Sequence, residues 1–320
     1  METRTLDSPP SILPLYARAA APLVPGASRL PFVPGGGGEI PDTELVLDGV
    51  RPDTNAVAAY AKVCGFSLRD TLPPTYPHVL AFPLHMAVMA DGSFPFGAVG
   101  LVHVENRIAQ HRPIGLGEEL RLVVRPTPLQ PHKRGQTFGL FTEARVDGEA
   151  VWQSTSTMLH RGKPQNPADG PKSRLGVDKS AHRPPGAGLI ASAEWRLGGD
   201  LGRRYASVSG DRNPIHMHSL TAKPLGFPGA IAHGMWTKAR CLAALEGRLP
   251  DAFAAEVRFR KPIRLPGRVE LLSDAGPEEI HFAVRDAKRH TPHLDGAVTP
   301  LEPKRRSMTA SNENSGRNSK

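Results

Sequence analysis

Cysteine is almost absent from this chain of 320 residues, which contains only Cys64 and Cys241. Two cysteines argue against a disulfide framework and favour a reducing compartment, so we expect a cytoplasmic protein. Long apolar runs are also missing, because no segment approaches the roughly 18 consecutive apolar residues that a membrane-spanning helix requires. The N-terminal residues make a poor signal or transit peptide, since acidic residues and prolines interrupt their short apolar stretch.

Acidic residues are fewer than basic ones: 31 Asp and Glu stand against 40 Lys and Arg, which gives a formal net charge of +9. A basic surface favours an anionic partner. Nucleic acid is not expected, because basic residues do not alternate with aromatic ones and no helix-turn-helix pattern is present. A phosphate-bearing carrier of a small substrate would suit the same charge. With 39% hydrophobic and 22% charged residues, the chain is predicted to be globular.

Glycine and proline are abundant, at 32 and 33 residues, and their clusters divide the chain. Residues 1–45 form a Pro- and Gly-rich extension, and residues 162–188 have the composition of an interdomain linker. A disordered basic tail is predicted for residues 302–320. Two domains of ordinary size remain between these segments, at residues 46–161 and 189–301.

These two domains resemble each other in sequence. The motif YAKVCG at residues 60–65 matches YASVSG at residues 205–210, and RPIGLGEEL at residues 112–120 matches KPIRLPGRVEL at residues 261–271. Both matches occur in the same order and at nearly the same offset. The sequence therefore predicts a duplicated domain.

Both domains have the same predicted secondary structure. A short helix carries the Tyr-Ala motif, and a longer helix follows it at about residues 82–90 and at residues 233–250. Alternating apolar and polar residues then predict antiparallel strands, with Asp147 and Gly148 at the turn of one hairpin. One long central helix wrapped by a curved antiparallel sheet is an α+β architecture, and the sequence predicts two such domains in tandem.

A polar motif distinguishes the second domain. Residues 205–227 read YASVSGDRNPIHMHSLTAKPLGF, and residues 231–235 read IAHGM. This combination closely resembles the signature of MaoC-like (R)-specific enoyl-CoA hydratases and 3-hydroxyacyl-thioester dehydratases. The resemblance implies a hotdog fold, and the duplication is similar to the double-hotdog members of that family, in which one half keeps the catalytic motif. Departures are few: His218 stands where the family often has Asp, and Thr221 precedes the alanine.

The first domain departs from the motif completely. Cys64 and Phe66 occupy the positions that match Ser209 and Asp211, and no Asn-Pro-x-His follows them. The first domain is therefore predicted to have kept the architecture and lost the chemistry.

Asp211, His216 and Gly234 are the candidate catalytic residues. Hydration of an α,β-unsaturated thioester needs a base for the water, a proton for C2 and stabilisation of the charge on the thioester oxygen. The resemblance implies that Asp211 and His216 form a dyad acting through one water, and it leaves open which group abstracts and which donates. Gly234 is predicted to open the central helix, where unpaired amides favour negative charge, so its N–H is the candidate oxyanion donor.

Three further polar residues, Ser209, Asn213 and His233, are predicted to orient the dyad or to contact the substrate. The neighbouring His216 and His218 are not expected to bind a metal, because a metal site needs three or four ligands and no acidic partner is patterned nearby. No cofactor is expected.

The predicted activity is that of a hydro-lyase. It would hydrate trans-2-enoyl thioesters, or dehydrate (R)-3-hydroxyacyl thioesters, of coenzyme A or acyl carrier protein in fatty-acid or related acyl metabolism. We expect the acyl chain to enter the first domain, where apolar residues 79–90, with Leu84 and Met86 among them, would line its pocket. A homodimer is one possible assembly. Two alternatives stay open: a hotdog thioesterase, and a non-catalytic acyl-thioester-binding subunit that completes another protein.

Overall fold

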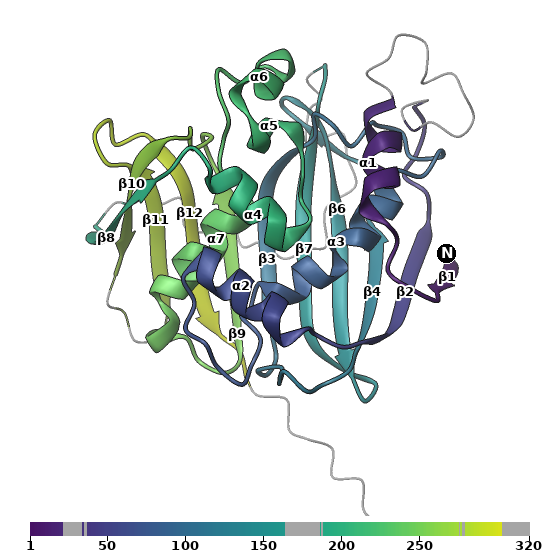
Figure 1. Ribbon diagram of the computed structural model, residues 1–320, viewed down its shortest axis with the longest axis horizontal. Helices are drawn as coiled ribbons and strands as arrows, with labels where there is room; N and C mark the ends of the chain where they lie inside the picture. Colours follow the sequence, from purple (N-terminus) through teal and green to yellow (C-terminus); the bar gives the residue numbers. More distant parts are fainter. Residues whose placement is uncertain are drawn as a thin grey trace, which may run out of the picture.

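A twelve-stranded sheet runs through both halves of the molecule (Figure 1). The computed structural model describes residues 1–21, 34, 37–163, 186, 188–274, 276 and 279–302. We call residues 43–161 the first half and residues 190–300 the second half. The predicted linker falls mostly, and the predicted basic tail almost entirely, outside the described residues. Among the residues described, no helix is long and apolar enough to cross a membrane.

Each half contains two main helices and a set of antiparallel strands. The first half consists of β2 (Thr43–Val50), α2 (Thr54–Cys64), α3 (Tyr76–Met89), β3 (Val102–Gln110), β4 (Leu120–Pro126), β5 (Gln130–His132), β6 (Gly135–Val146) and β7 (Glu149–Arg161). The second half consists of β8 (Ile190–Leu197), α4 (Leu201–Ser209), α5 (Pro214–Met217), α6 (Ser219–Ala222), η4 (Lys223–Leu225), α7 (Gly234–Ala244), η5 (Glu246–Arg248), β9 (Phe253–Phe259), β10 (Gly267–Ser273), β11 (Ile280–Asp286) and β12 (Pro292–Pro300).

The strand order is the same in both halves. The first half runs β2-β4-β6-β7-β3, with the short β5 paired to β6 off this path, and the second half runs β8-β10-β11-β12-β9. With β5 left out, the first, third, fourth, fifth and second strands of each half follow one another across the sheet. Strands β3 and β9 pair antiparallel, from Glu105 opposite Arg258 to Gln110 opposite Phe253, and join the halves. The repeated order agrees with the duplication predicted from the sequence.

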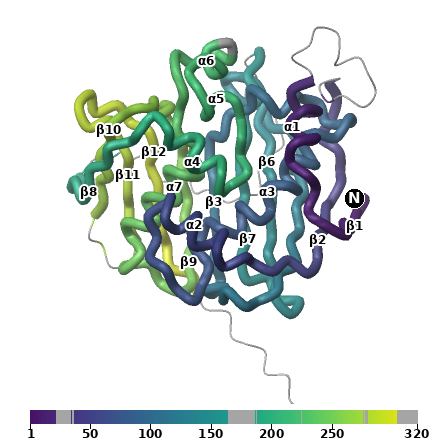
Figure 2. Tube along the Cα trace, viewed as in Figure 1, coloured from purple at the N-terminus to yellow at the C-terminus, as the bar shows by residue number. Residues whose placement is uncertain are grey.

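Helices gather on one face of the sheet, with α3 in the first half and α7 in the second (Figure 1 and Figure 2). In α7, Met235, Ala239 and Leu242 recur on one side of the helix and are buried, as their spacing predicts. Helices α2 and α4 pack against each other, and their motif tyrosines meet with Tyr60 and Tyr205 ring centroids 6.1 Å apart. The two copies of the Tyr-Ala motif therefore form part of the contact between the halves.

A buried lysine also ties the halves together. Nζ of Lys238, on α7, donates to the Asn106 side-chain oxygen at 2.6 Å, to the Asn106 carbonyl at 3.2 Å and to the Ala255 carbonyl at 2.8 Å. Its acceptors lie on β3 and β9, the two strands that join the halves. Three acceptors match the three donors of an ammonium group, so the buried side chain is fully hydrogen-bonded.

The N-terminal residues add two elements that the sequence did not predict. Strand β1 (Glu2–Leu6) pairs parallel with β2, and helix α1 (Ile12–Ala20) packs against α3. The predicted hairpin between β6 and β7 is confirmed, because Asp147 and Gly148 both have positive φ, at 49° and 80°. Two consecutive left-handed residues suit the tight turn of an antiparallel hairpin.

Candidate active site

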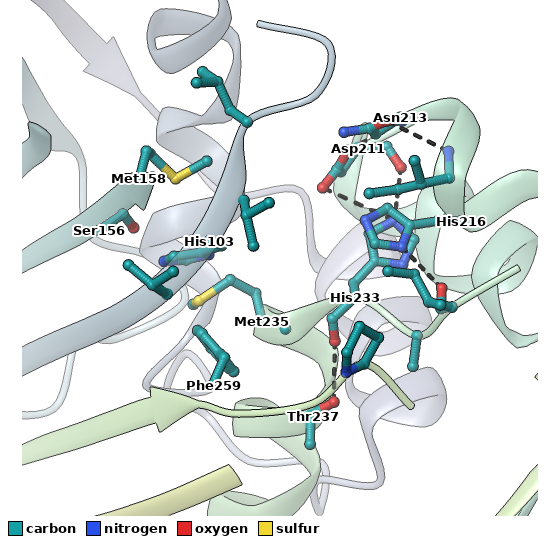
Figure 3. A pocket seen from close by; sticks show the side chains of 18 of the residues that line it. His103, Ser156, Met158, Asp211, Asn213, His216, His233, Met235, Thr237 and Phe259 are labelled. Atoms are coloured by element: carbon teal, nitrogen blue, oxygen red, sulfur yellow. Dashed lines mark hydrogen bonds and ion pairs between the residues drawn. The ribbon is translucent and has the colours of Figure 1, made fainter. Parts of the chain in front are cut away.

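A cavity of about 310 Å³ lies between the two halves (Figure 3). Its first-half wall comes from α3, β3, β6 and β7. Its second-half wall comes from the end of α4, the segment between α4 and α7, the start of α7, and residues 259–263. In Figure 3, Asp211 and His216 lie on one side of the cavity, and Ser156 and Met158 lie on the other. A ligand bound here would contact both halves.

Asp211 follows α4 directly, where Gly210 ends the helix in a left-handed conformation with φ at 75°. Oδ1 of Asp211 accepts the N–H of Asn213 at 3.1 Å, and the Asp211 N–H donates to Oγ of Ser209 at 3.2 Å. The loop itself therefore fixes the carboxylate, as an aspartate does in an Asx turn. The Asp211 side chain is 29% exposed and lines the cavity.

His216 lies in the short helix α5, which Pro214 begins and the side chain of Asn213 caps by accepting the Ile215 N–H at 3.4 Å. Nδ1 of His216 lies 2.8 Å from the Ile231 carbonyl oxygen. Because a carbonyl only accepts, Nδ1 carries the proton, and Nε2 of the neutral ring keeps its lone pair.

Asp211, His216 and His233 form one cluster. One carboxylate oxygen and one nitrogen from each ring lie within 4.8 Å of one another. The His216 and His233 rings stack with centroids 3.7 Å apart, as Figure 3 shows. Nε2 of His233 donates to the backbone carbonyl of Asp211 at 3.0 Å, so this histidine holds the loop that carries the carboxylate.

Gly234 opens α7 and lines the cavity, which is the place predicted for it. A Cβ at this position would lie 3.0 Å from the ring of Phe259, so a glycine lets that ring pack against the helix start. The unpaired amides at a helix N-terminus carry partial positive charge. The structure therefore brings the predicted helix start, Asp211 and His216 to one cavity.

The surroundings of the cluster determine the charge of its members at neutral pH. Burial acts to raise the pKa of Asp211, but His233, His216 and hydrogen bonds from Asn213 and Tyr16 outweigh it and hold that pKa below its ordinary value. Burial lowers the pKa of His216 below the ordinary histidine value, against the opposing effect of the Asp211 charge. A carboxylate and a neutral imidazole therefore face the cavity together.

Comparisons with known proteins identify relatives of this chain. The family described as "MaoC like domain" matches residues 183–293. The 3-hydroxyacyl-thioester dehydratase X of Mycobacterium tuberculosis is 36% identical over 298 residues, which cover 91% of this chain and 99% of that protein.

The chain belongs to the MaoC-like dehydratase family.

Solved structures of MaoC-like proteins share its fold. The crystal structure of the same M. tuberculosis dehydratase superimposes with a TM-score of 0.70 at 35% identity, over 81% of this chain and all of that one. A conserved hypothetical protein from M. tuberculosis, described as having a double hotdog fold, reaches a TM-score of 0.57 at 15% identity, over 83% of this chain and 98% of its own. The predicted α+β double hotdog is confirmed.

Metal binding fits this MaoC-like site poorly, although Asp211, His216 and His233 are close enough to be considered. Nδ1 of His216 and Nε2 of His233 each donate to a backbone carbonyl, so neither nitrogen offers a lone pair. The other nitrogen of His233 is buried without a hydrogen-bond partner. The His233 nitrogen nearest the carboxylate, Nε2 at 3.9 Å from Oδ2 of Asp211, is therefore occupied by its hydrogen bond to a carbonyl rather than open to an ion between the three residues.

Leu84 and Met86 do not line the cavity, and the prediction for these two residues was wrong. Both are buried in the hydrophobic core, with 0% and 3% of their surface exposed. Other residues of α3 face the cavity instead, among them Val79, Phe82 and Met89. The prediction that residues 79–90 provide an apolar wall therefore holds for other members of the same helix.

Sequence reasoning also missed polar residues of the MaoC-like site. Tyr16, from the N-terminal helix α1, donates a hydrogen bond to Asp211. Three histidines of the first half, His78, His85 and His103, line the cavity. Burial lowers the pKa of His78 to about 4 and that of His103 to about 3, so they are neutral at neutral pH. No local motif marks any of these residues.

Proposed function

We propose that this protein is a hydro-lyase that interconverts trans-2-enoyl and (R)-3-hydroxyacyl thioesters in the cavity between its halves. The observation that carries the proposal is the pairing of an ionised Asp211 with a neutral His216, within 4.8 Å of each other and beside the N-terminus of α7. The activity named for the M. tuberculosis relative, 3-hydroxyacyl-thioester dehydratase, is of the same class.

Hydration begins with a water held between Asp211 and His216. The water oxygen bonds to C3 of the enoyl group while one O–H bond breaks and its proton passes to the dyad. The π electrons of the C2–C3 bond move toward C1, and the negative charge collects on the thioester oxygen. The N–H of Gly234 stabilises this charge, and C2 then takes a proton to complete the 3-hydroxyacyl product.

The source of the C2 proton follows from the hydrogen bonds of the dyad. Asp211 is ionised, and His216 carries its proton on Nδ1, where the Ile231 carbonyl holds it. Neither group therefore has a transferable proton at the cavity before water binds. The proton that C2 receives is the one that the attacking water lost, and dehydration runs the same steps in reverse.

Asn213, Ser209 and His233 support the dyad through backbone and side-chain contacts. Ser209 and Asn213 fix the loop around Asp211, and His233 stacks on the His216 ring. Substitution of His233 would therefore be expected to weaken catalysis by moving the dyad rather than by removing a proton carrier.

The carrier is expected to be coenzyme A or acyl carrier protein. Arg134, Arg161 and Lys261 are exposed residues that line the cavity, and a phosphate-bearing pantetheine arm complements such charges. The acyl chain would then extend along the first-half wall. A cytoplasmic location and assembly into a homodimer are further parts of this proposal.

The test is hydration of crotonyl-CoA and longer trans-2-enoyl-CoAs by the purified protein. Asp211→Asn and His216→Gln should each lower kcat/KM by about 10²–10⁴-fold, the usual contribution of a general acid or base. His218→Gln is the matched control, because His218 is exposed and two residues from His216, and it should keep near-native activity.

Two results would reject the proposal. One is native-like turnover in either dyad variant. The other is release of free thiol without hydration, which would identify a thioesterase instead. A protein that is inert until mixed with a second hotdog protein would point to the non-catalytic subunit.

A further inference from the structure

The N-terminal helix α1 reaches the catalytic loop of the second half, although the residues in contact are 195 positions apart in the sequence. Oη of Tyr16 donates to Oδ1 of Asp211 at 3.0 Å. The same hydroxyl lies 2.6 Å from the backbone nitrogen of Arg212. Tyr16 therefore contacts both the carboxylate and the backbone of the loop that holds it.

The direction of each hydrogen bond follows from the chemistry of the partners. A backbone N–H only donates, so the Tyr16 oxygen accepts from Arg212 and its own proton points to the ionised carboxylate. Burial and the neighbouring Asp211 charge raise the pKa of Tyr16 far above its ordinary value. The phenol therefore keeps its proton, and remains a hydrogen-bond donor, at and well above neutral pH.

We propose that Tyr16 is a positioning residue for Asp211, which makes the N-terminal helix part of the active site. Oδ1 of Asp211 receives two hydrogen bonds, from Tyr16 and from the N–H of Asn213. Two donors on Oδ1 stop the carboxylate from rotating and leave Oδ2 as the oxygen closest to His233, at 3.9 Å. Oδ2 then serves as the oxygen that meets the water. This inference rests on the proposed catalytic role of Asp211.

The position of α1 is fixed independently of this hydrogen bond. Leu15 and Ala19 are buried in the core, and α1 packs against α3. Ile12 approaches the catalytic loop so closely that a Cβ on Gly210 would lie 2.7 Å from its Cδ1. Loss of the Tyr16 hydroxyl alone should therefore leave the helix in place, so the hydrogen bond can be tested separately from the packing.

A positioning role predicts a change in pH dependence that a packing role does not. A hydrogen bond to the ionised carboxylate favours that form, so its loss should raise the pKa of Asp211 and move the acid limb of kcat to higher pH. The other titratable groups acting on Asp211 come from every element around it. They are His216, His233, Tyr205, His78 and His103. All of these groups are still present when Tyr16 is substituted. The difference between the pH profiles of the native protein and of the Tyr16 variant is therefore attributed to Tyr16.

The experiment compares Tyr16→Phe with Tyr76→Phe in the full chain, using crotonyl-CoA hydration from neutral pH down to below 3.8, the ordinary carboxyl pKa beneath which that of Asp211 lies. Tyr76 is a buried tyrosine of α3 with no hydrogen bond to Asp211 among those described, so it controls for loss of a buried hydroxyl. Tyr16→Phe should lower kcat by about tenfold, as expected for loss of a hydrogen bond to a charged group, with KM changed much less. Its acid limb should move to higher pH, whereas that of Tyr76→Phe should not move.

A conservative replacement covers the case in which Tyr16→Phe folds poorly. Tyr16→3-fluorotyrosine keeps the ring and the hydroxyl but donates more strongly, so the acid limb should move to lower pH than in the native protein. An unmoved limb in either Tyr16 variant, whether or not kcat falls, overturns the proposal. Failure of the function itself would show differently, as an active Asp211→Asn variant.

Discussion

The two halves share one strand order but differ in the segment that leads from the short helix to the central helix. In the first half, residues 65–75 cover this distance. In the second half, residues 210–233 do so, and the longer path contains α5, α6 and η4. Both members of the dyad lie in this longer segment. The proposed acid–base groups therefore come from the connection between the two main helices rather than from the sheet or from those helices.

Matched positions within these segments show what the first half has become. Phe66, which matches Asp211 in sequence, is 7% exposed and belongs to the hydrophobic core. Cys64, which matches Ser209, is fully buried. The cavity-facing carboxylate of Asp211 thus corresponds to the packed aromatic ring of Phe66 in the first half. The first half therefore has packed core residues at the matching positions, and it contributes one wall to the cavity.

After the dyad variants, the largest effect is expected from Phe66→Asp. An unpaired carboxylate at this buried position should lower the free energy of unfolding by about 3–5 kcal/mol, as measured by urea denaturation. Phe66→Leu, which keeps the site apolar, should cost much less. In an Asp211→Asn background, Phe66→Asp should restore no hydration, because no histidine follows it in the short segment. Recovered activity would show that the length of this segment does not explain why the first half lacks the proposed activity.

An intermediate effect is expected from Met158→Trp, which narrows the first-half wall of the cavity. Longer enoyl-CoAs should lose about tenfold or more in kcat/KM, since pocket contacts of this kind are worth about 1–3 kcal/mol, while crotonyl-CoA should be nearly unaffected. Met86→Leu is the control, because Met86 is a core residue of the same half and keeps its volume in the exchange. Equal loss for all chain lengths would contradict the first-half location of the acyl chain.

The smallest effect concerns pH. Burial holds the pKa of His216 below its ordinary 6.5, so the ring stays neutral as the pH falls through that value. The pKa of Asp211 is also held below its ordinary value, so the carboxylate stays ionised over the same range. We expect kcat/KM for crotonyl-CoA to remain level from neutral pH to below 6.5. An acid limb centred at or above pH 6.5 would contradict the assignment of Asp211 as ionised and His216 as neutral, because it would mean that one of them takes up a proton at that pH.

Local patterns predicted much of the fold and the dyad. The helices and the β6–β7 hairpin follow from periodicity and turn residues over short windows, and the duplication follows from two pairs of matching motifs. The closeness of Asp211 and His216 is also local, because only four residues, one of them Pro214, lie between them. The cavity-facing side of α3 could not be predicted, because residues 79–90 are apolar on nearly every side. Packing against β2, β4 and β6 decides which side is buried in the core.

Contacts between distant segments could not be predicted from local patterns. A recognisable helix pattern is present at Ser11, Ile12, Leu15 and Ala19, so the existence of α1 could have been predicted from the sequence. Its docking on the catalytic loop depends on the tertiary structure of both halves. The buried position of Lys238 could not be predicted either. In the sequence it looks like an ordinary polar residue of a helix, and only the folded structure brings its three acceptors on β3 and β9 to it.

The pairing of β3 with β9 in one chain has a consequence for how the sequence of such a protein can evolve. Two identical subunits joined along these strands would carry every substitution twice, so a residue that closed one catalytic centre would close both. A single chain that holds both copies is free of this constraint. One copy can replace its reactive groups with residues that line the binding cavity, while the other copy keeps them. Because the two copies are covalently linked, they stay together although they differ.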